Sequence, residues 1–144
     1  MAAEYESNHR CSVLVVDDDP STGELLTIAL QDDYLVAAVA NGRQALHYLR
    51  SHAETCIILL ELRLPVMDGR QFRTVQLRDR SLAWIPVIVI SAVADVEQRA
   101  RELGARCFVR KPINLDELRH AVKRVGCCPA GRLRTGLQRI PAMR

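Results

Sequence analysis

The stretch Val-Leu-Val-Val-Asp-Asp-Asp-Pro, residues 13–20, decides the fold of this chain. Four apolar residues, three of them valine, are followed directly by three carboxylates and a proline. A short and continuously apolar run is typical of a strand that is buried on both faces, as in a parallel sheet. Pro20 suits the first turn of a helix, because that position needs no backbone N–H donor. The stretch therefore predicts a buried strand, an acidic turn and then a helix.

The same alternation of apolar strands and amphipathic helices continues along the chain. Five strands separated by helices imply a parallel sheet with right-handed crossovers and helices on both faces. We therefore expect a doubly wound α/β fold, in which ligands bind beyond the carboxyl ends of the strands. The predicted strands cover residues 12–16, 34–39, 56–60, 86–90 and 106–109, and the predicted helices cover residues 20–31, 43–51, 71–79, 93–103 and 115–125.

Length and charge limit the class of protein. With 144 residues, the chain has the usual length of one domain. The formal net charge is +3, of which the four arginines of residues 127–144 contribute +4, so residues 1–126 carry −1. That near-neutral part does not resemble a nucleic-acid-binding face. We expect a short N-terminal extension (1–10), one domain (11–126) and a basic, flexible tail (127–144).

Hydropathy bears on where the protein works. No apolar run approaches the roughly 20 residues that a membrane-spanning helix needs. Residues 1–10 are polar and contain no apolar signal core. We therefore expect a cytoplasmic protein that binds neither membranes nor nucleic acid.

Polar residues follow four of the five predicted strands at the edge where a ligand would bind. Adjacent carboxylates repel one another, so the acidic run of residues 17–19 favours a nearby cation. Aspartate is equally common as a turn and capping residue. Carboxylates suit a hard divalent cation, whereas lysine and serine suit phosphoryl oxygens. In strand order, the residues are Asp17–Asp19, Glu61, Ser91–Ala92 and Lys111.

Four motifs in this order resemble the receiver domain of bacterial two-component response regulators (CheY-like), over about residues 11–126. They are Val-Leu-Val-Val-Asp-Asp-Asp-Pro (13–20), Leu-x-Leu-Pro-Val-Met-Asp-Gly (62–69), Ile-Pro-Val-Ile-Val-Ile-Ser-Ala (85–92) and Lys-Pro-Ile (111–113). The resemblance implies a flavodoxin-like fold of five βα units with strand order 2-1-3-4-5. It also implies signalling in which a histidine kinase phosphorylates an aspartate at the end of the third strand.

The resemblance further assigns roles by position. Asp17 and Asp18 would form the acidic pocket for Mg²⁺, with the residue at the acceptor position and the backbone carbonyl of Arg63. The guanidinium of Arg63 is open to two interpretations. It either pairs with an acid of the pocket and stands in for Mg²⁺, or it is a solvated loop arginine.

On the anion side of the pocket, Ser91, Ala92 and Lys111 would contact the phosphoryl group. Phe108 takes the place of the switch aromatic, whose rotamer follows the state of the pocket.

The chain departs from the family at the acceptor position, which holds Glu61. The extra methylene moves the carboxylate by about one C–C bond, roughly 1.5 Å, and a misplacement of about 1 Å can cost on the order of 100-fold in rate. Three interpretations remain: a partial mimic of phospho-aspartate, a relic of a decayed pocket, or a working acceptor. Binding of Mg²⁺ would be weakened or absent.

For function, we expect a binding module that is not an enzyme and that is not phosphorylated in the usual way. Its partner would be a histidine kinase or another signalling protein, or a second copy bound through residues 93–103, 106–109 and 115–125. A phosphorelay shuttle that uses the acidic pocket is the alternative. A phosphohydrolase is a third interpretation, because residues 17–19 contain Asp-x-Asp, but we expect no cap domain.

Overall fold

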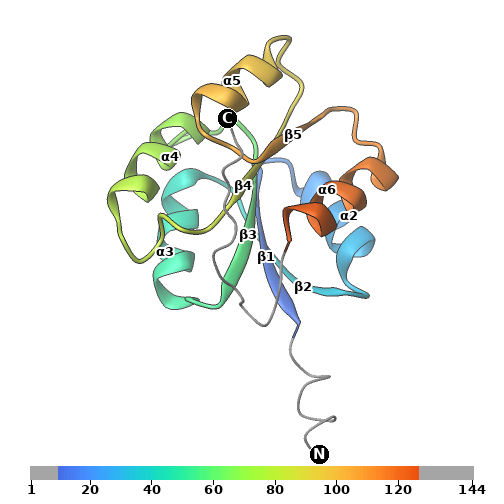
Figure 1. The fold of residues 1–144 in the computed structure, drawn as a ribbon, viewed down its shortest axis with the longest axis horizontal. Helices are drawn as coiled ribbons and strands as arrows, with labels where there is room; N and C mark the ends of the chain where they lie inside the picture. Colours follow the sequence, from blue (N-terminus) through green and yellow to red (C-terminus); the bar gives the residue numbers. More distant parts are fainter. Residues whose placement is uncertain (1–9, 127–144) are drawn as a thin grey trace, which may run out of the picture.

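The computed structural model describes residues 10–126, which form one five-stranded parallel sheet with helices on both faces (Figure 1). The strand order is β2-β1-β3-β4-β5, so the predicted flavodoxin-like α/β fold is confirmed. The strands are β1 (Cys11–Val16), β2 (Tyr34–Val39), β3 (Thr55–Leu60), β4 (Val87–Ser91) and β5 (Cys107–Arg110). The helices are α2 (Pro20–Leu30), α3 (Gly42–Ser51), α4 (Gly69–Arg78), α5 (Val96–Glu102) and α6 (Leu115–Val125).

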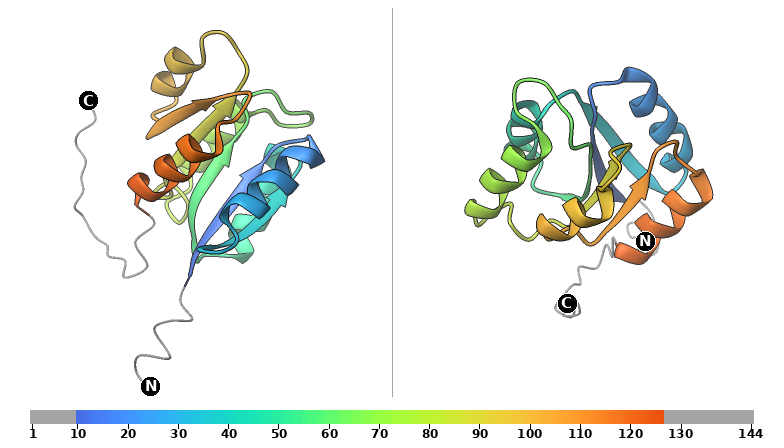
Figure 2. Two further views of the ribbon diagram at one scale, coloured as in Figure 1. Left: turned by 90° about the vertical axis from the view of Figure 1, so that its right-hand side faces the viewer. Right: turned by 90° about the horizontal axis from the view of Figure 1, so that it is seen from above.

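The sheet separates two hydrophobic cores, which is why its central strands are apolar throughout. Helices α3, α4 and α5 cover one face, and α2 and α6 cover the other (Figures 1 and 2). Successive side chains of a strand point to opposite faces. In β1, Leu14 and Val16 accordingly belong to the core under α3, α4 and α5, whereas Val13 and Val15 belong to the core under α2 and α6. This arrangement holds the carboxyl ends of β1, β3 and β4 rigidly side by side.

Two helices begin two or more residues away from the start that the sequence predicted. Helix α4 starts at Gly69, because Asp68 and Gln71 form a capping box in which each side chain bonds the other's backbone N–H. Gly69 is required there, since a Cβ would lie 2.7 Å from the backbone oxygen of Glu61. Helix α5 starts only at Val96, so residues 92–95 form a loop directly after β4.

Of the three expected parts of the chain, the structure describes the central domain. The expected basic tail (127–144) and nearly all of the N-terminal extension (1–9) lie outside the described residues. Within residues 10–126, none of the helices is long and apolar enough to cross a membrane.

Candidate functional site

Four of the residues singled out from the sequence come together at the carboxyl ends of four strands. Asp17 follows β1, Glu61 follows β3, Ser91 is the last residue of β4, and Lys111 follows β5. All four are linked by one continuous set of side-chain hydrogen bonds. We call this group the strand-end cluster.

Glu61 is the centre of the strand-end cluster, and both of its carboxylate oxygens are engaged. Oε1 accepts a hydrogen bond from Lys111 Nζ at 2.7 Å. Oε2 accepts one from Ser91 Oγ at 2.6 Å and two more from the backbone N–H groups of Leu62 (2.8 Å) and Arg63 (3.2 Å). Glu61 is only 7% exposed. The carboxylate is therefore held inward by four donors and does not point to bulk water.

Lys111 lies between two buried carboxylates. Its Nζ is 2.8 Å from Asp17 Oδ2 and 2.7 Å from Glu61 Oε1. The other oxygen of Asp17, Oδ1, accepts the backbone N–H of Asp19 at 2.9 Å. Two anions thus share one cation, and the three charged groups together carry −1. One ammonium bridging two carboxylates accounts for the burial of both.

Burial and hydrogen bonding shift the pKa values of Glu61 and Lys111 in opposite directions. Burial alone raises the pKa of Glu61, but hydrogen bonds from Lys111, Ser91 and the Arg63 backbone outweigh it and leave the pKa below its usual value. Burial alone lowers the pKa of Lys111, but the bonds to Asp17 and Glu61 leave that pKa above its usual value. Both shifts favour the charged forms, so the ion pair is present at neutral pH.

The residues in this arrangement do not fit a magnesium ion. Mg²⁺ requires near-octahedral oxygen ligands at about 2.0–2.1 Å. Both oxygens of Asp17 and both of Glu61 already accept hydrogen bonds, and the ammonium of Lys111 lies between the two carboxylates. Asp18 is exposed. Across residues 10–126, no group of three or more His, Cys, Asp or Glu side chains is gathered to hold a metal.

The guanidinium of Arg63 does not take the place of a metal ion. The Arg63 side chain is exposed and belongs to none of the ion pairs found within residues 10–126. The stand-in interpretation is therefore wrong, and the solvated loop arginine is correct. Lys111 supplies the cation, and Arg63 contributes its backbone N–H to Glu61.

The remaining predicted residues have different surroundings. Asp19 caps α2 by accepting the backbone N–H of Ser21 at 2.9 Å, so the capping interpretation holds for this member of the acidic run. Ala92 is exposed at the start of the loop after β4. Phe108 is half-buried and packs against the core under α3, α4 and α5. The guanidinium of Arg110, which the sequence did not single out, lies 5.6 Å from the centre of the Phe108 ring.

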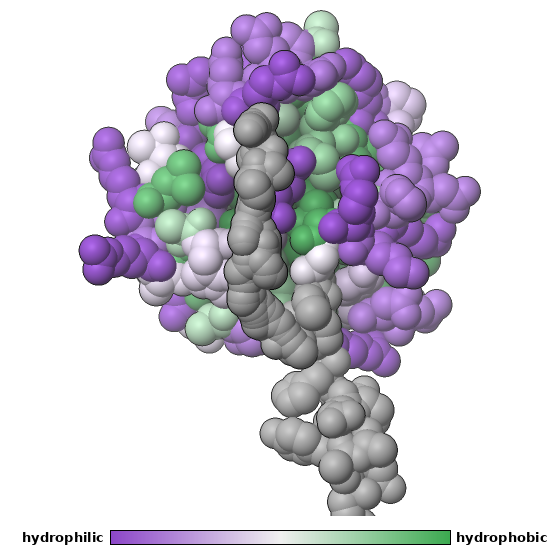
Figure 3. Space-filling model, in the orientation of Figure 1, coloured by the Kyte–Doolittle hydropathy of each residue, from purple (hydrophilic) through white to green (hydrophobic). Residues whose placement is uncertain are grey.

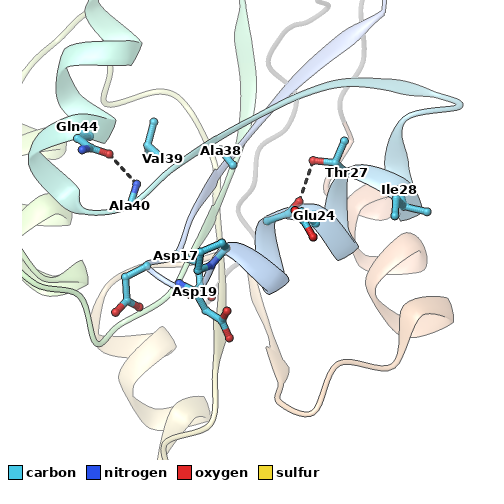
Figure 4. A pocket seen from close by; sticks show the side chains of 12 residues that line it. Asp17, Asp19, Glu24, Thr27, Ile28, Ala38, Val39, Ala40 and Gln44 are labelled. Carbon is cyan, nitrogen blue, oxygen red and sulfur yellow. Dashed lines mark hydrogen bonds between the residues drawn. The ribbon is translucent and has the colours of Figure 1, made fainter.

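A groove between α2 and β2 shares Asp17 with the strand-end cluster. Figure 4 shows Asp17 and Asp19 at one end of this groove and Thr27 and Ile28 toward the other. Glu61, Ser91 and Lys111 do not line it. Its lining residues are Asp17, Asp18, Asp19, Pro20, Gly23, Glu24, Thr27, Ile28, Ala38, Val39, Ala40 and Gln44.

With this geometry established, the chain can be compared with known proteins. Residues 13–123 match the response regulator receiver domain. The chain belongs to this family. The match spans the sheet and reaches into α6, and so includes every residue of the strand-end cluster.

Curated relatives include regulators from several bacteria. The chain is 32% identical over 116 residues to "Sporulation initiation phosphotransferase F" of Bacillus subtilis, covering 78% of this chain and 90% of the relative. It is 36% identical over 112 residues to "DNA-binding response regulator MtrA" of Mycolicibacterium smegmatis, covering 76% and 47%. The Bacillus subtilis relative is a short protein. Several other curated relatives are longer, and the chain spans about half or less of their length.

Solved receiver structures are similar over the whole domain. The chemotaxis response regulator CheY4 of Vibrio cholerae aligns with a TM-score of 0.73 and 28% identity, covering 81% of this chain and 99% of that one. The receiver domain of the sensor histidine kinase PA1611 from Pseudomonas aeruginosa, described with a magnesium ion in its active-site cleft, aligns with a TM-score of 0.72 and 26% identity, covering 80% and 96%.

Proposed function

We propose that this receiver is a protein-binding signalling module that is not phosphorylated in the usual way, with Glu61 acting as a partial mimic of phospho-aspartate. The observation that carries the proposal is the pair of contacts from Ser91 Oγ (2.6 Å) and Lys111 Nζ (2.7 Å) to the Glu61 carboxylate. These two side chains are the ones that the family resemblance assigns to the phosphoryl group. In this chain their donors are already bound to Glu61.

The mimicry is partial for an electrostatic reason. A phosphoryl group carries about −1.5 to −2 at neutral pH and three acceptor oxygens. The Glu61 carboxylate carries −1 and has two oxygens. It therefore engages Ser91 and Lys111 but attracts Lys111 less strongly than a phosphoryl group would. We expect an output state that is biased toward the active form and independent of a kinase.

Several features argue against Glu61 as an acceptor. Its oxygens hold four hydrogen bonds, and its lowered pKa marks a carboxylate that is stabilised as an anion and is a weaker nucleophile. An extended side chain displaced by about one C–C bond is also misaligned for in-line attack, which can cost on the order of 100-fold. We accordingly propose that the domain is not an enzyme and that Mg²⁺ binding is weak or absent.

A phosphorelay shuttle is the second candidate function. The observation that favours it is the similarity to a protein named as a sporulation initiation phosphotransferase over 90% of that protein's length. This function requires Glu61 or a neighbouring acid to accept the phosphoryl group.

The relic interpretation makes a different requirement, namely that loss of the Glu61 contacts leaves the binding surface unchanged.

Output through contact with another protein follows from the mimic proposal. The surface formed by α5, β5 and α6 is the proposed docking face for a signalling partner or for a second copy, and hydrophilic side chains cover it over α5 (Figure 3). Three exposed ion pairs on this surface join residues three or four apart in sequence, so they are worth little to stability. These pairs are Arg99–Asp95, Arg101–Glu97 and Arg119–Asp116. A histidine kinase or another signalling protein remains the proposed binding partner.

The proposal is tested by offering the protein a small phosphodonor. The wild type, Glu61→Asp and Glu61→Gln are incubated with acetyl phosphate and Mg²⁺, and their intact masses are measured. We expect one added phosphoryl group on Glu61→Asp, and none on the wild type or on Glu61→Gln. A phosphoryl adduct on the wild type that disappears in Glu61→Gln would support the shuttle and overturn the proposed function.

A further inference from the structure

Arg110, the last residue of β5, contacts two parts of the molecule at once. Its guanidinium carbon lies 5.6 Å from the centre of the Phe108 ring, within the range of a cation–π interaction. Its Nη1 donates a hydrogen bond to the backbone carbonyl of Ala94 at 3.3 Å. Ala94 belongs to the loop of residues 92–95, so Arg110 joins that loop to the aromatic ring on β5.

The same loop begins at the strand-end cluster. Ser91, whose Oγ donates to Glu61, directly precedes it, and the backbone N–H of Val93 lies 3.5 Å from that same Oγ. A change in the Glu61–Ser91 contact therefore acts first on residues 92–95. Ala94 is three residues along the chain from Ser91, and it is the point at which Arg110 holds the loop.

Phe108 needs such a link, because a phenylalanine ring has no polar atom with which to bond the loop backbone. A planar guanidinium can stack on an aromatic face and still direct N–H donors to a carbonyl, which neither an ammonium nor an amide does as well. The neighbouring carboxylate does not neutralise it, since Asp95 pairs with Arg99 at 3.2 Å. Arg110 therefore remains available to both Phe108 and Ala94.

We infer that Arg110 is a positioning residue that couples the orientation of Phe108 to the loop of residues 92–95 behind Ser91. The inference deepens the proposed function and rests on it where it assigns Glu61 as the source of the signal. Through this link, the contacts that Glu61 makes in the strand-end cluster reach the exposed side of β5.

The first test measures the link itself by amide hydrogen exchange in the full chain. Arg110→Gln removes the charge and the stacking plane at an exposed position, and Arg80→Gln removes an exposed arginine elsewhere as the matched control. We expect amides of residues 93–96 to exchange about three- to tenfold faster in Arg110→Gln, the range for losing one ordinary hydrogen bond. Exchange as slow as in Arg80→Gln would overturn the inference.

The second test reads the Phe108 ring directly. The chain has two phenylalanines, so labelling with 4-fluorophenylalanine gives two ¹⁹F signals, and fully buried Phe72 serves as the internal reference. We expect Arg110→Gln to shift the Phe108 signal and leave the Phe72 signal in place. Arg110→Lys, which keeps the charge but lacks the fork, should give an intermediate shift.

Adding Glu61→Gln separates the inference from the proposed function. We expect Glu61→Gln to shift the Phe108 signal when Arg110 is present and to shift it by less than half as much in Arg110→Gln. Equal shifts in both backgrounds would overturn the coupling through Arg110. If Glu61→Gln shifts the signal in neither background while Arg110→Gln still speeds exchange at residues 93–96, the link stands and the mimic role of Glu61 fails.

Discussion

Two clusters of buried polar side chains in the domain contain charged groups, and the two clusters satisfy their charges differently. Under α4, the guanidinium of Arg73 donates to three neutral oxygens: the backbone carbonyls of Leu103 (2.8 Å) and Gly104 (3.1 Å) and Oε1 of Gln76 (2.8 Å). Gln76 in turn donates to the carbonyls of Leu82 and Ile85. We call this group the α4 cluster. It ties α4 to the segments that precede β4 and β5.

The strand-end cluster instead sets a half-buried cation against two buried anions. Lys111 and Glu61 can each gain or lose a proton, so their attraction depends on pH and on any added charge. The oxygens that accept hydrogen bonds from Arg73 belong to two backbone carbonyls and one amide, so they do not titrate. The pKa of Arg73 is lowered first by burial and then by the charge of Arg106. The comparison teaches that burial alone does not mark a functional site, whereas buried charges that respond to one another do.

The largest expected effect comes from removing the shared cation. Lys111→Met leaves the carboxylates of Asp17 and Glu61 buried without their counter-charge, and we expect it to lower the free energy of unfolding by about 3 kcal/mol at pH 7. The loss should shrink toward pH 4, because without Lys111 the pKa of Glu61 is no longer held down and its carboxylate takes up a proton. Urea unfolding followed by circular dichroism at both pH values measures it.

Lys123→Met is the matched control for this variant. Lys123 is exposed on α6, and its replacement should change the free energy of unfolding by less than about 0.5 kcal/mol. A Lys111→Met variant as stable as this control would show that the two carboxylates do not depend on the ammonium.

The α4 cluster gives the next largest effect and a different pH profile. Arg73→Met removes the donors to two backbone carbonyls and to Gln76, and we expect a loss of about 2 kcal/mol. Because none of those acceptors titrates, the loss should be the same at pH 7 and pH 4. A loss that shrinks at pH 4, as for Lys111→Met, would remove the distinction between the two clusters.

A smaller effect is expected for the wild type as the pH falls. The folded-state pKa of Glu61 lies below its unfolded value, so its contribution is fully present above that unfolded value, about 4.3, and is lost as the pH falls through the folded pKa. Lys111, with a raised pKa, loses its contribution only at alkaline pH. Glu61→Gln should therefore flatten the stability profile between neutral pH and pH 3. An unchanged profile would show that the pH dependence of stability comes from groups other than Glu61.

The sequence predicted the parts of the molecule that depend on chain order. Apolar runs bounded by polar turns determine the strands, and strand order brings residues 17, 61, 91 and 111 to one edge of the sheet. The residues of the strand-end cluster were therefore predictable, because each one follows or ends its strand. The resemblance to receivers supplied the roles that their chemistry left open.

Other features depend on distances that no pattern specifies. The choice of Lys111 over Arg63 as the cation follows from where each side chain points, since both follow a strand at the edge of the sheet where the carboxylates gather. Arg73 and Gln76 were missed because polar residues on a helix ordinarily predict a solvated face. The capping box of Asp68 and Gln71 was readable from its spacing, but Gly69 between them suggested a loop.

The central claim is that the Glu61 carboxylate occupies the place of a phosphoryl group, and ¹⁵N NMR tests it most directly. The reference states come from Glu61→Asp, recorded without ligand and with Mg²⁺ and beryllium trifluoride, which mimics a phosphoryl group on aspartate. We expect the wild-type amide signals of Val93, Ala94 and Phe108 to lie closer to those of the loaded variant. Wild-type signals that coincide with those of the unloaded variant would contradict the account.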